Sequence, residues 1–195
     1  NSLQIFGEWE ESELLLFYKL LNPNDNVIEV GANIGTHTVP IAKRLFKGGS
    51  ITAFEMIRNT FYFLAANLAI NGITNAQAYN LGLGNISQTL NIGVADFQVD
   101  SNIGSASLWD LDIDLMQQRN NQLDTTSILT TSLKMITLDN FYKINHTSSY
   151  DSNQCPKLIK TDAEGYDELI LRGGNHLITR CFPILYIENK CIALS

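Results

Sequence analysis

The sequence predicts an α/β fold, in which a doubly wound, mostly parallel sheet carries helices on both faces. Two observations lead to this prediction: short apolar runs typical of buried parallel strands alternate with longer segments of helical periodicity, and turn residues separate them. The chain has 195 residues, of which 45% are hydrophobic, enough for one full core. We therefore expect one domain over residues 1–195.

The first half of the chain predicts a helix followed by a βαβαβ unit. Asn22-Pro23-Asn24-Asp25 ends the first helix, Gly48-Gly49 the second and Asn71-Gly72 the third. The strand candidates are apolar runs, and the first stops at Gly31. In order, the expected elements are helix 12–21, strand 27–30, helix 34–46, strand 50–54, helix 58–70 and strand 76–83.

The regular alternation stops over residues 85–137, where Gly, Ser, Thr, Asn and Gln are dense. This stretch is expected to be an insertion or lid with a substrate loop, because no run in it could build its own core. Regular elements then return as far as Glu188, and the strand hairpin that usually completes such a sheet is expected to be missing. The elements expected here are strands 89–94 and 132–137, helices 111–119 and 138–142, strand 157–160, helix 166–180 and strand 184–187.

Composition excludes several classes of protein. The net charge of −7 would repel a phosphate backbone, and no basic cluster is visible, so we expect no nucleic-acid partner. No apolar run near residue 1 is long enough to span a bilayer, and no basic segment precedes one. Cys155, Cys181 and Cys191 are an odd set without CxxC spacing, which predicts free thiols in a reducing compartment. The protein is accordingly expected to be cytoplasmic and without a membrane span.

The turn after the first strand predicts a binding site. Gly31 permits a tight turn, Gly35 permits close packing of the following helix, and the helix N-terminus is expected to offer N–H groups to a ligand. Asn33 stands where a dinucleotide-binding turn has its middle glycine, which argues against NAD. Glu29 suits a cationic or amine-bearing ligand, such as S-adenosylmethionine. Glu55, after the second strand, is placed to accept both hydroxyls of a ribose, and Met56 to contact an adenine.

A second set of polar residues follows the later strands. Asp162 and Glu164 come after strand 157–160, and Glu188 and Asn189 come after strand 184–187. Ligands of open α/β sheets bind at the carboxyl ends of the strands, so these side chains are expected to face the same crevice as Glu29. Capping of the following helix by Asp162 or Glu164 is the alternative.

Six segments, in this order, resemble the FkbM family of S-adenosylmethionine-dependent methyltransferases. They are GEWEESE, VIEVGANIGTHTVPIAK, SITAFEMIRNTFYFLAANLAINGI, YNLGLGN, LIKTDAEGYDELILRGG and PILYIEN. The resemblance implies a class I (Rossmann-like) methyltransferase fold and methyl transfer to a hydroxyl of a sugar, glycan or natural product. It implies that the turn holds the methionine part of the cofactor, Glu55 the ribose, and that Asp162 and Glu164 lie at the reaction centre. The residues expected to bind the cofactor are Glu29, Gly31, Ala32, Asn33, Gly35, Glu55, Met56 and Asp162.

Two mechanisms remain open. In the first, Asp162 or Glu164 is the general base for the acceptor hydroxyl, with His37 and His146 as secondary candidates and His176 expected at the surface. In the second, a divalent metal bound by Asp162, Glu188 and Asn189 acidifies the hydroxyl.

Two other functions remain as alternatives, a non-catalytic ligand-binding relative and an NAD-dependent oxidoreductase. The expected partner is a small-molecule or glycan acceptor, and the unpaired sheet edge favours a homo-oligomer. Polar residues of the insertion and Trp109 suit a polyol, but they do not identify the acceptor.

Overall fold

The computed structural model describes residues 10–93, 130–145 and 155–188. These residues divide into two compact units, each built from segments distant in the sequence. Of these residues, the first unit contains 10–80, 155–161 and 181–186, and the second contains 81–93, 130–145, 162–180 and 187–188. The single domain expected over residues 1–195 stays a prediction. No helix among the described residues is both long and apolar enough to cross a membrane.

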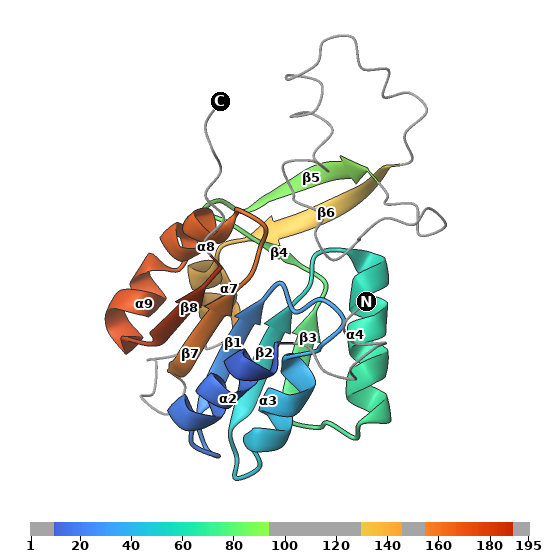
Figure 1. Cartoon of the computed structure of the whole chain (residues 1–195). Coiled ribbons are helices and arrows are strands. Elements are labelled where there is room, and N and C mark those ends of the chain that lie inside the picture. Colours follow the sequence, from blue (N-terminus) through green and yellow to red (C-terminus); the bar gives the residue numbers. More distant parts are fainter. Residues whose placement is uncertain (1–9, 94–129, 146–154, 189–195) are drawn as a thin grey trace. The chain divides into compact units, whose positions relative to one another are not determined.

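The first unit is built on a five-stranded sheet with the order β3-β2-β1-β7-β8 (Figure 1). β1 pairs in parallel with both β2 and β7, and β2 pairs in parallel with β3, which confirms the mostly parallel α/β sheet. The strands are β1 (Asn26–Val30), β2 (Ser50–Phe54), β3 (Ala76–Tyr79), β7 (Pro156–Thr161) and β8 (Ile184–Ile187). All five lie where the apolar runs of the sequence predicted strands.

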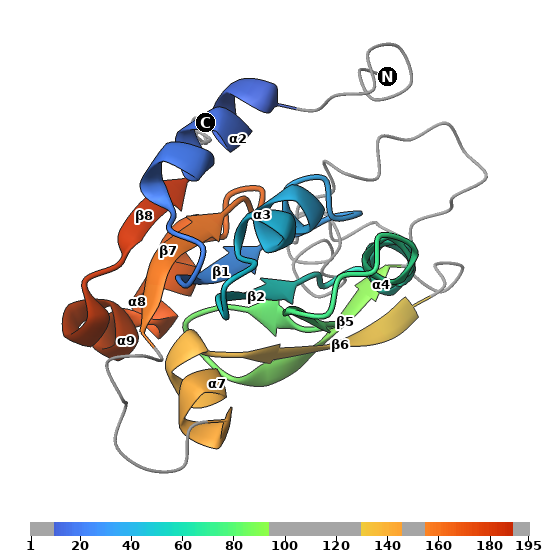
Figure 2. The ribbon, with the colours of Figure 1, turned by 90° about the horizontal axis from the view of Figure 1, so that it is seen from below.

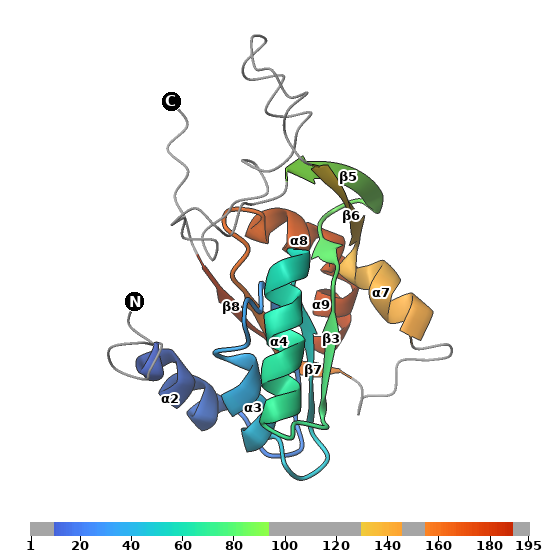
Figure 3. The same cartoon turned by 90° about the vertical axis from the view of Figure 1, so that its right-hand side faces the viewer.

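Three helices of the first unit pack through apolar stripes. They are α2 (Glu11–Leu20), α3 (Thr38–Arg44) and α4 (Arg58–Ile70). Figure 3 shows α4 running alongside β3, and its Leu64 and Leu68 pack in a cluster with Ala53 of β2. The core beneath α2 and α3 is formed by Phe17, Leu21, Val27, Ile41, Ala42, Leu45, Ile51 and Leu158.

The second unit has a sheet of its own, with the order β4-β6-β5 (Figure 1), and Figure 2 shows β5 alongside β6. β5 (Gln88–Gly93) pairs antiparallel with β6 (Thr130–Ile136), and β4 (Gly82–Leu83) pairs parallel with β6. Its helices are α7 (Leu138–Asn145), α8 (Asp167–Gly173) and α9 (Asn175–Cys181). The strands predicted at the two ends of the insertion are thus confirmed. The predicted helix 111–119 lies outside the described residues, and so does the region that would test the predicted absence of a terminal hairpin.

Three predicted elements differ from the structure. The helix expected over 34–46 begins only at Thr38, because Gly35 and the residues before it form turns. The strand expected over 76–83 is interrupted at Asn80, whose side-chain amide donates to the carbonyls of Glu55 and Met56. The segment expected as one helix over 166–180 is two helices, α8 and α9, which meet at Gly174.

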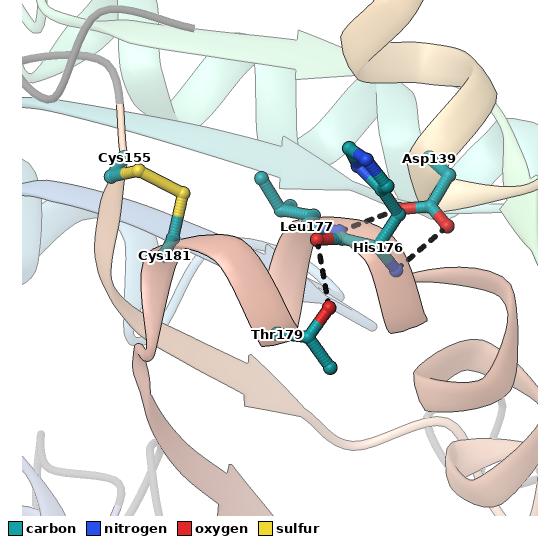
Figure 4. The surroundings of a disulfide bond; sticks show 6 residues. All are labelled: Asp139, Cys155, His176, Leu177, Thr179 and Cys181. Atoms are coloured by element: carbon teal, nitrogen blue, oxygen red, sulfur yellow. Dashed lines mark hydrogen bonds between the residues drawn. A yellow bond between two sulfur atoms is a disulfide. The ribbon is translucent and has the colours of Figure 1, made fainter.

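The prediction of free thiols is wrong for two of the three cysteines. Cys155, just before β7, and Cys181, the last residue of α9, form a disulfide with their Cα atoms 5.4 Å apart (Figure 4). The two cysteines are 26 residues apart in sequence, and only the pairing of distant segments brings them together. In the second unit, the Asp139 carboxylate accepts the backbone N–H groups of His176 and Leu177 at 3.0 and 2.9 Å, which caps the start of α9. Cys191 lies outside the described residues.

Candidate cofactor and carboxylate sites

The turn between β1 and α3 has an unusual backbone. Gly31, Asn33 and Gly35 have φ values of 77°, 51° and 92°, in the region that favours glycine. Asn33 tolerates this conformation because asparagine is one of the few other residues that adopt it, and its side-chain oxygen accepts the N–H of Ile34 at 2.8 Å. At Gly35 a Cβ atom would lie 2.8 Å from Cδ1 of Leu64, so the turn also approaches α4 closely.

The backbone N–H groups of residues 31–35 are all bonded inside the first unit. Gly31 and Ala32 donate to the carbonyl of Phe54, both at 3.0 Å, and Gly35 donates to the carbonyl of Ala32 at 2.9 Å. Asn33 donates to the Glu55 carboxylate and Ile34 to the Asn33 side chain. A turn whose donors are already used is poorly suited to a pyrophosphate, which is bound largely by such groups.

Glu55 lies beside this turn and is only 6% exposed. Its Oε2 accepts the N–H of Asn33 at 2.9 Å, and its Oε1 accepts the N–H of Ile57 at 2.8 Å. Burial raises the pKa of this carboxyl to about 7, although the two backbone hydrogen bonds lower it, and the charge of Glu29 raises it further. A carboxyl in this state gains or loses its proton near neutral pH.

Glu29 is even more buried, at 1% exposure, and its charge has partners inside the protein. Its Oε2 accepts the hydroxyl of Thr38 at 2.7 Å, and its Oε1 lies 4.0 Å from Nζ of Lys160, which is 2% exposed. The sequence predicts Lys160 as a residue of strand 157–160 and gives no sign of a partner for its charge. The pairing follows from strand register, since Glu29 of β1 stands beside Lys160 of β7.

His37 also has carboxylate partners. It is 3% exposed, and its Nε2 lies 3.7 Å from Oε2 of Glu10 and 3.8 Å from Oε2 of Glu13. The three residues tie the start of α2 to the residue before α3. The sequence singled out His37 but gave no sign of its two partners.

Of the other residues predicted in the first unit, Ala32 is buried in the turn and Met56 is half-buried after β2. Met56 contributes its backbone carbonyl as the acceptor for Asn80. Gly31, Asn33 and Glu55 are therefore brought together around one turn, with Glu29 behind it.

The second unit brings Asp162, Glu164 and Glu188 together. One carboxylate oxygen from each lies within 4.8 Å of the others, and all three side chains are half-buried. Glu164 has φ of 52°, a strained conformation for a residue other than Gly, Asn or Asp. Asn189, the other predicted metal ligand, lies outside the described residues. The expectation that these carboxylates face the same crevice as Glu29 joins residues of two different units and stays a prediction.

Asp167, the first residue of α8, is a further residue near Glu164, and the sequence did not single it out. It is 5% exposed, and its two carboxylate oxygens accept the N–H groups of Ala163 at 3.2 Å and Gly165 at 3.3 Å. It thereby holds both neighbours of Glu164. The N-cap of α8 is Tyr166 and has no side-chain hydrogen bond, so neither Asp162 nor Glu164 serves as its cap. An acidic residue two positions after Gly165, in the first turn of a helix, was the available signal.

His176 is exposed, as predicted, whereas His146 and Trp109 lie outside the described residues.

The parallel sheet and the glycine turn after its central strand define a Rossmann-like α/β protein of the class I methyltransferase kind. The family model described as the methyltransferase FkbM domain matches residues 29–191. The chain therefore belongs to the FkbM family of S-adenosylmethionine-dependent methyltransferases. A search of curated proteins finds no significant match.

Solved structures similar to parts of the chain include other methyltransferases. An S-adenosylmethionine-dependent methyltransferase from Aquifex aeolicus is 16% identical, with 48% of this chain and 47% of that chain covered and a TM-score of 0.35. TYW2 from M. jannaschii, in complex with AdoMet, is 24% identical over 38% and 36%, with a TM-score of 0.33. An rRNA methylase from Streptococcus thermophilus is 16% identical over 35% and 40%, with a TM-score of 0.32. The matches span less than half of each solved chain.

Proposed function

We propose that the protein transfers the methyl group of S-adenosylmethionine to a hydroxyl oxygen of a sugar, glycan or natural product. The observation that carries the cofactor part of this proposal is the pairing of Glu55 with the turn at Asn33. A buried carboxylate beside a glycine turn is suited to the two hydroxyls of a ribose. The turn has its own N–H groups bonded internally, which suits a ligand without phosphate.

The residues fit the cofactor by their chemistry. Glu55 would accept the ribose hydroxyls, Met56 would contact the adenine, and the turn from Gly31 to Gly35 would hold the methionine part. Bound S-adenosylmethionine supplies an electrophilic methyl group on a sulfonium. Because displacement at that carbon needs in-line approach, we expect the protein to contribute mainly by aligning the acceptor oxygen.

A hydroxyl is a weak nucleophile, so the acceptor must lose its proton as the oxygen–carbon bond forms and the carbon–sulfur bond breaks. Asp162 or Glu164 is the proposed base for that proton. Support comes from the conformation of Glu164, whose φ of 52° is held in place by Asp167 on both sides. Strain of this kind is concentrated at functional sites.

A metal-assisted reaction is the second candidate for this step, and the cluster of Asp162, Glu164 and Glu188 supports it. Three carboxylates within a few ångströms form an oxygen-only donor set, which fits a hard divalent cation such as Mg²⁺. Such a cation would acidify the acceptor hydroxyl. Activity that needs Mg²⁺ and is lost with chelator would favour the metal, and activity in chelator would favour the base alone.

The first test is calorimetric titration of the purified protein with S-adenosylmethionine, S-adenosylhomocysteine and NAD. We expect micromolar binding of the first two and none of NAD. Glu55→Ala should weaken binding by at least about 100-fold, because it removes hydrogen bonds to a charged group as well as the anchor of the turn. Glu168→Ala, which changes an exposed carboxylate of α8, is the matched control. Binding of NAD instead would support the oxidoreductase, and cofactor binding with no turnover on any acceptor would support the non-catalytic relative.

The acceptor and the assembly are part of the same proposal. The net charge of −7 favours an uncharged polyol over a nucleic acid, so we expect methyl transfer to glycans and not to RNA in a mixed acceptor screen. A homo-oligomer is expected from the sheet edge, and light scattering measures it.

The location of the protein is a separate question, for which the disulfide is the pertinent observation. A cytoplasmic location was predicted from the residue pattern near residue 1 together with free thiols, whereas structural disulfides persist mainly in oxidising compartments. We propose that the Cys155–Cys181 bond forms in such an environment. Alkylation and mass spectrometry of protein isolated from its native cells should find both cysteines protected until reductant is added. Alkylation of both without reductant would restore the cytoplasmic interpretation.

A further inference from the structure

The interior of the first unit contains a pair of opposite charges, of which the basic member, Lys160, has no part in the proposed reaction. Lys160 is 2% exposed and Glu29 is 1% exposed, and Nζ lies 4.0 Å from Oε1. Removing two charges from water is costly, and a buried pair is often no more stabilising than apolar residues of the same size. The pair is therefore poorly explained by stability alone, and its position in the fold suggests another role.

That position is directly behind the turn. Glu29 stands two residues before Gly31, and Thr38, the first residue of α3, immediately follows the turn segment. The Glu29 carboxylate accepts the Thr38 hydroxyl at 2.7 Å, so a single side chain joins both ends of the turn. Lys160 reaches the same carboxylate from β7, the strand on the other side of β1 from β2.

The backbone of the turn needs such support. Gly31, Asn33 and Gly35 all have φ in the left-handed region, and Glu55 holds only the middle of the turn, at Asn33. Without Lys160, Glu29 would be a buried carboxylate lacking its nearby cation, and it would take up a proton or move toward water. Either change would alter the acceptor that holds Thr38.

We propose that Lys160 is a positioning residue: through Glu29 and Thr38 it fixes the turn of residues 31–37 in the conformation that binds S-adenosylmethionine. The identity of the ligand in this inference rests on the proposed function. The effect of Lys160 on the conformation of the turn does not depend on it. Lys160 acts through the carboxylate and makes no contact with the cofactor.

The decisive variant is the double substitution Glu29→Gln/Lys160→Met, which removes both charges and keeps the side-chain volumes. Each single substitution would leave one charge buried, and that protein could fail to fold, whereas the double variant should keep the thermal stability of the parent. We expect it to bind S-adenosylmethionine about 10- to 100-fold more weakly, the range for loss of a hydrogen bond to a charged group. Thr38→Val, which leaves both charges in place, should weaken binding in the same direction.

Lys157→Met is the matched control, because Lys157 lies on the same strand but is exposed. It should leave cofactor affinity unchanged. Hydrogen exchange of the cofactor-free protein gives a second measurement: amides of residues 31–38 should exchange faster in the double variant and in Thr38→Val, while those of β2 should not.

A folded double variant that binds S-adenosylmethionine within about twofold of the parent, with unchanged exchange in the turn, would overturn the proposal. It would mean that the pair is only structural. If the parent protein itself bound no S-adenosylmethionine, the proposed function would fail, while faster exchange in the turn would still support the role of Lys160.

Discussion

Glu29 and Glu55 stand at the ends of neighbouring strands, and both are almost fully buried, yet the protein treats their charges differently. Glu29 lies near Lys160 and accepts the hydroxyl of Thr38, so its charge has a nearby cation. Glu55 accepts hydrogen bonds from the backbone N–H groups of Asn33 and Ile57, and burial raises its pKa to about 7. The Glu29 carboxylate thus supports the turn from behind. The Glu55 carboxylate contacts the turn at Asn33 and can change its protonation state near neutral pH.

The largest effect expected from this comparison concerns removal of one charge of the buried pair. Glu29→Gln removes the carboxylate that lies 4.0 Å from the buried Lys160 ammonium, which should cost about 3–5 kcal/mol of unfolding free energy. Adding Lys160→Met to this variant should recover stability to within about 1 kcal/mol of the parent. Urea unfolding at neutral pH measures both. A double variant as unstable as the single one would show that the two charges do not act as a pair.

Glu55 should show the opposite behaviour, as a dependence of stability on pH. Its pKa is raised from 4.5 to about 7 on folding, so the folded state binds the proton more tightly. The stability it contributes is complete below pH 4.5 and is lost as pH rises through about 7, by about 3 kcal/mol in total. The difference in unfolding free energy between the parent and Glu55→Gln should change by this amount between pH 4.5 and 8. A constant difference would mean that Glu55 titrates in the folded state as it does in the unfolded chain.

The sequence predicted the positions of the two carboxylates but not the difference between their surroundings. Glu29 and Glu55 could be predicted as a pair of site residues because Glu29 lies near the end of one apolar run expected to be a strand and Glu55 follows the next. The environment of Glu29 could not, because Lys160 is more than a hundred residues away and meets it only through the register of β1 and β7.

The same limit explains the other differences. Cys155, just before β7, forms a disulfide with Cys181 at the end of α9. Asp167 accepts backbone N–H groups on both sides of Glu164. The turn that begins at Gly31 places the first residue of α3 at Thr38. Periodicity identifies elements, whereas these features depend on which elements become neighbours.

The turn that the two carboxylates hold can be tested at its tightest point. Gly35→Ala introduces a Cβ into a left-handed residue and against Leu64, at 2.8 Å, whereas Gly48→Ala introduces one at a similar φ into open space. Gly48→Ala should therefore cost about 1 kcal/mol from backbone strain alone, and Gly35→Ala about 1–3 kcal/mol more from overpacking. Thermal unfolding of the two variants gives the difference directly. Equal losses would show that α4 moves away from the turn without cost.

The smallest expected effect is on the affinity for the cofactor. A ribose hydroxyl donates its hydrogen bond better to an ionised carboxylate than to a protonated one. With a pKa of about 7 in the cofactor-free protein, Glu55 is mostly protonated at pH 6 and mostly ionised at pH 8. The affinity for S-adenosylmethionine should therefore rise about tenfold over this range and level off above it.

Calorimetry at several pH values in buffers of different ionisation enthalpy would also detect the proton that Glu55 releases on binding. The Glu29→Gln/Lys160→Met variant should bind more weakly at every pH, and its midpoint should fall, because the charge of Glu29 that raises the pKa of Glu55 is gone. A midpoint that stayed at the same pH would mean that the charge of Glu29 does not reach Glu55, so that the residues behind the turn and the ligand-binding side of the turn act separately.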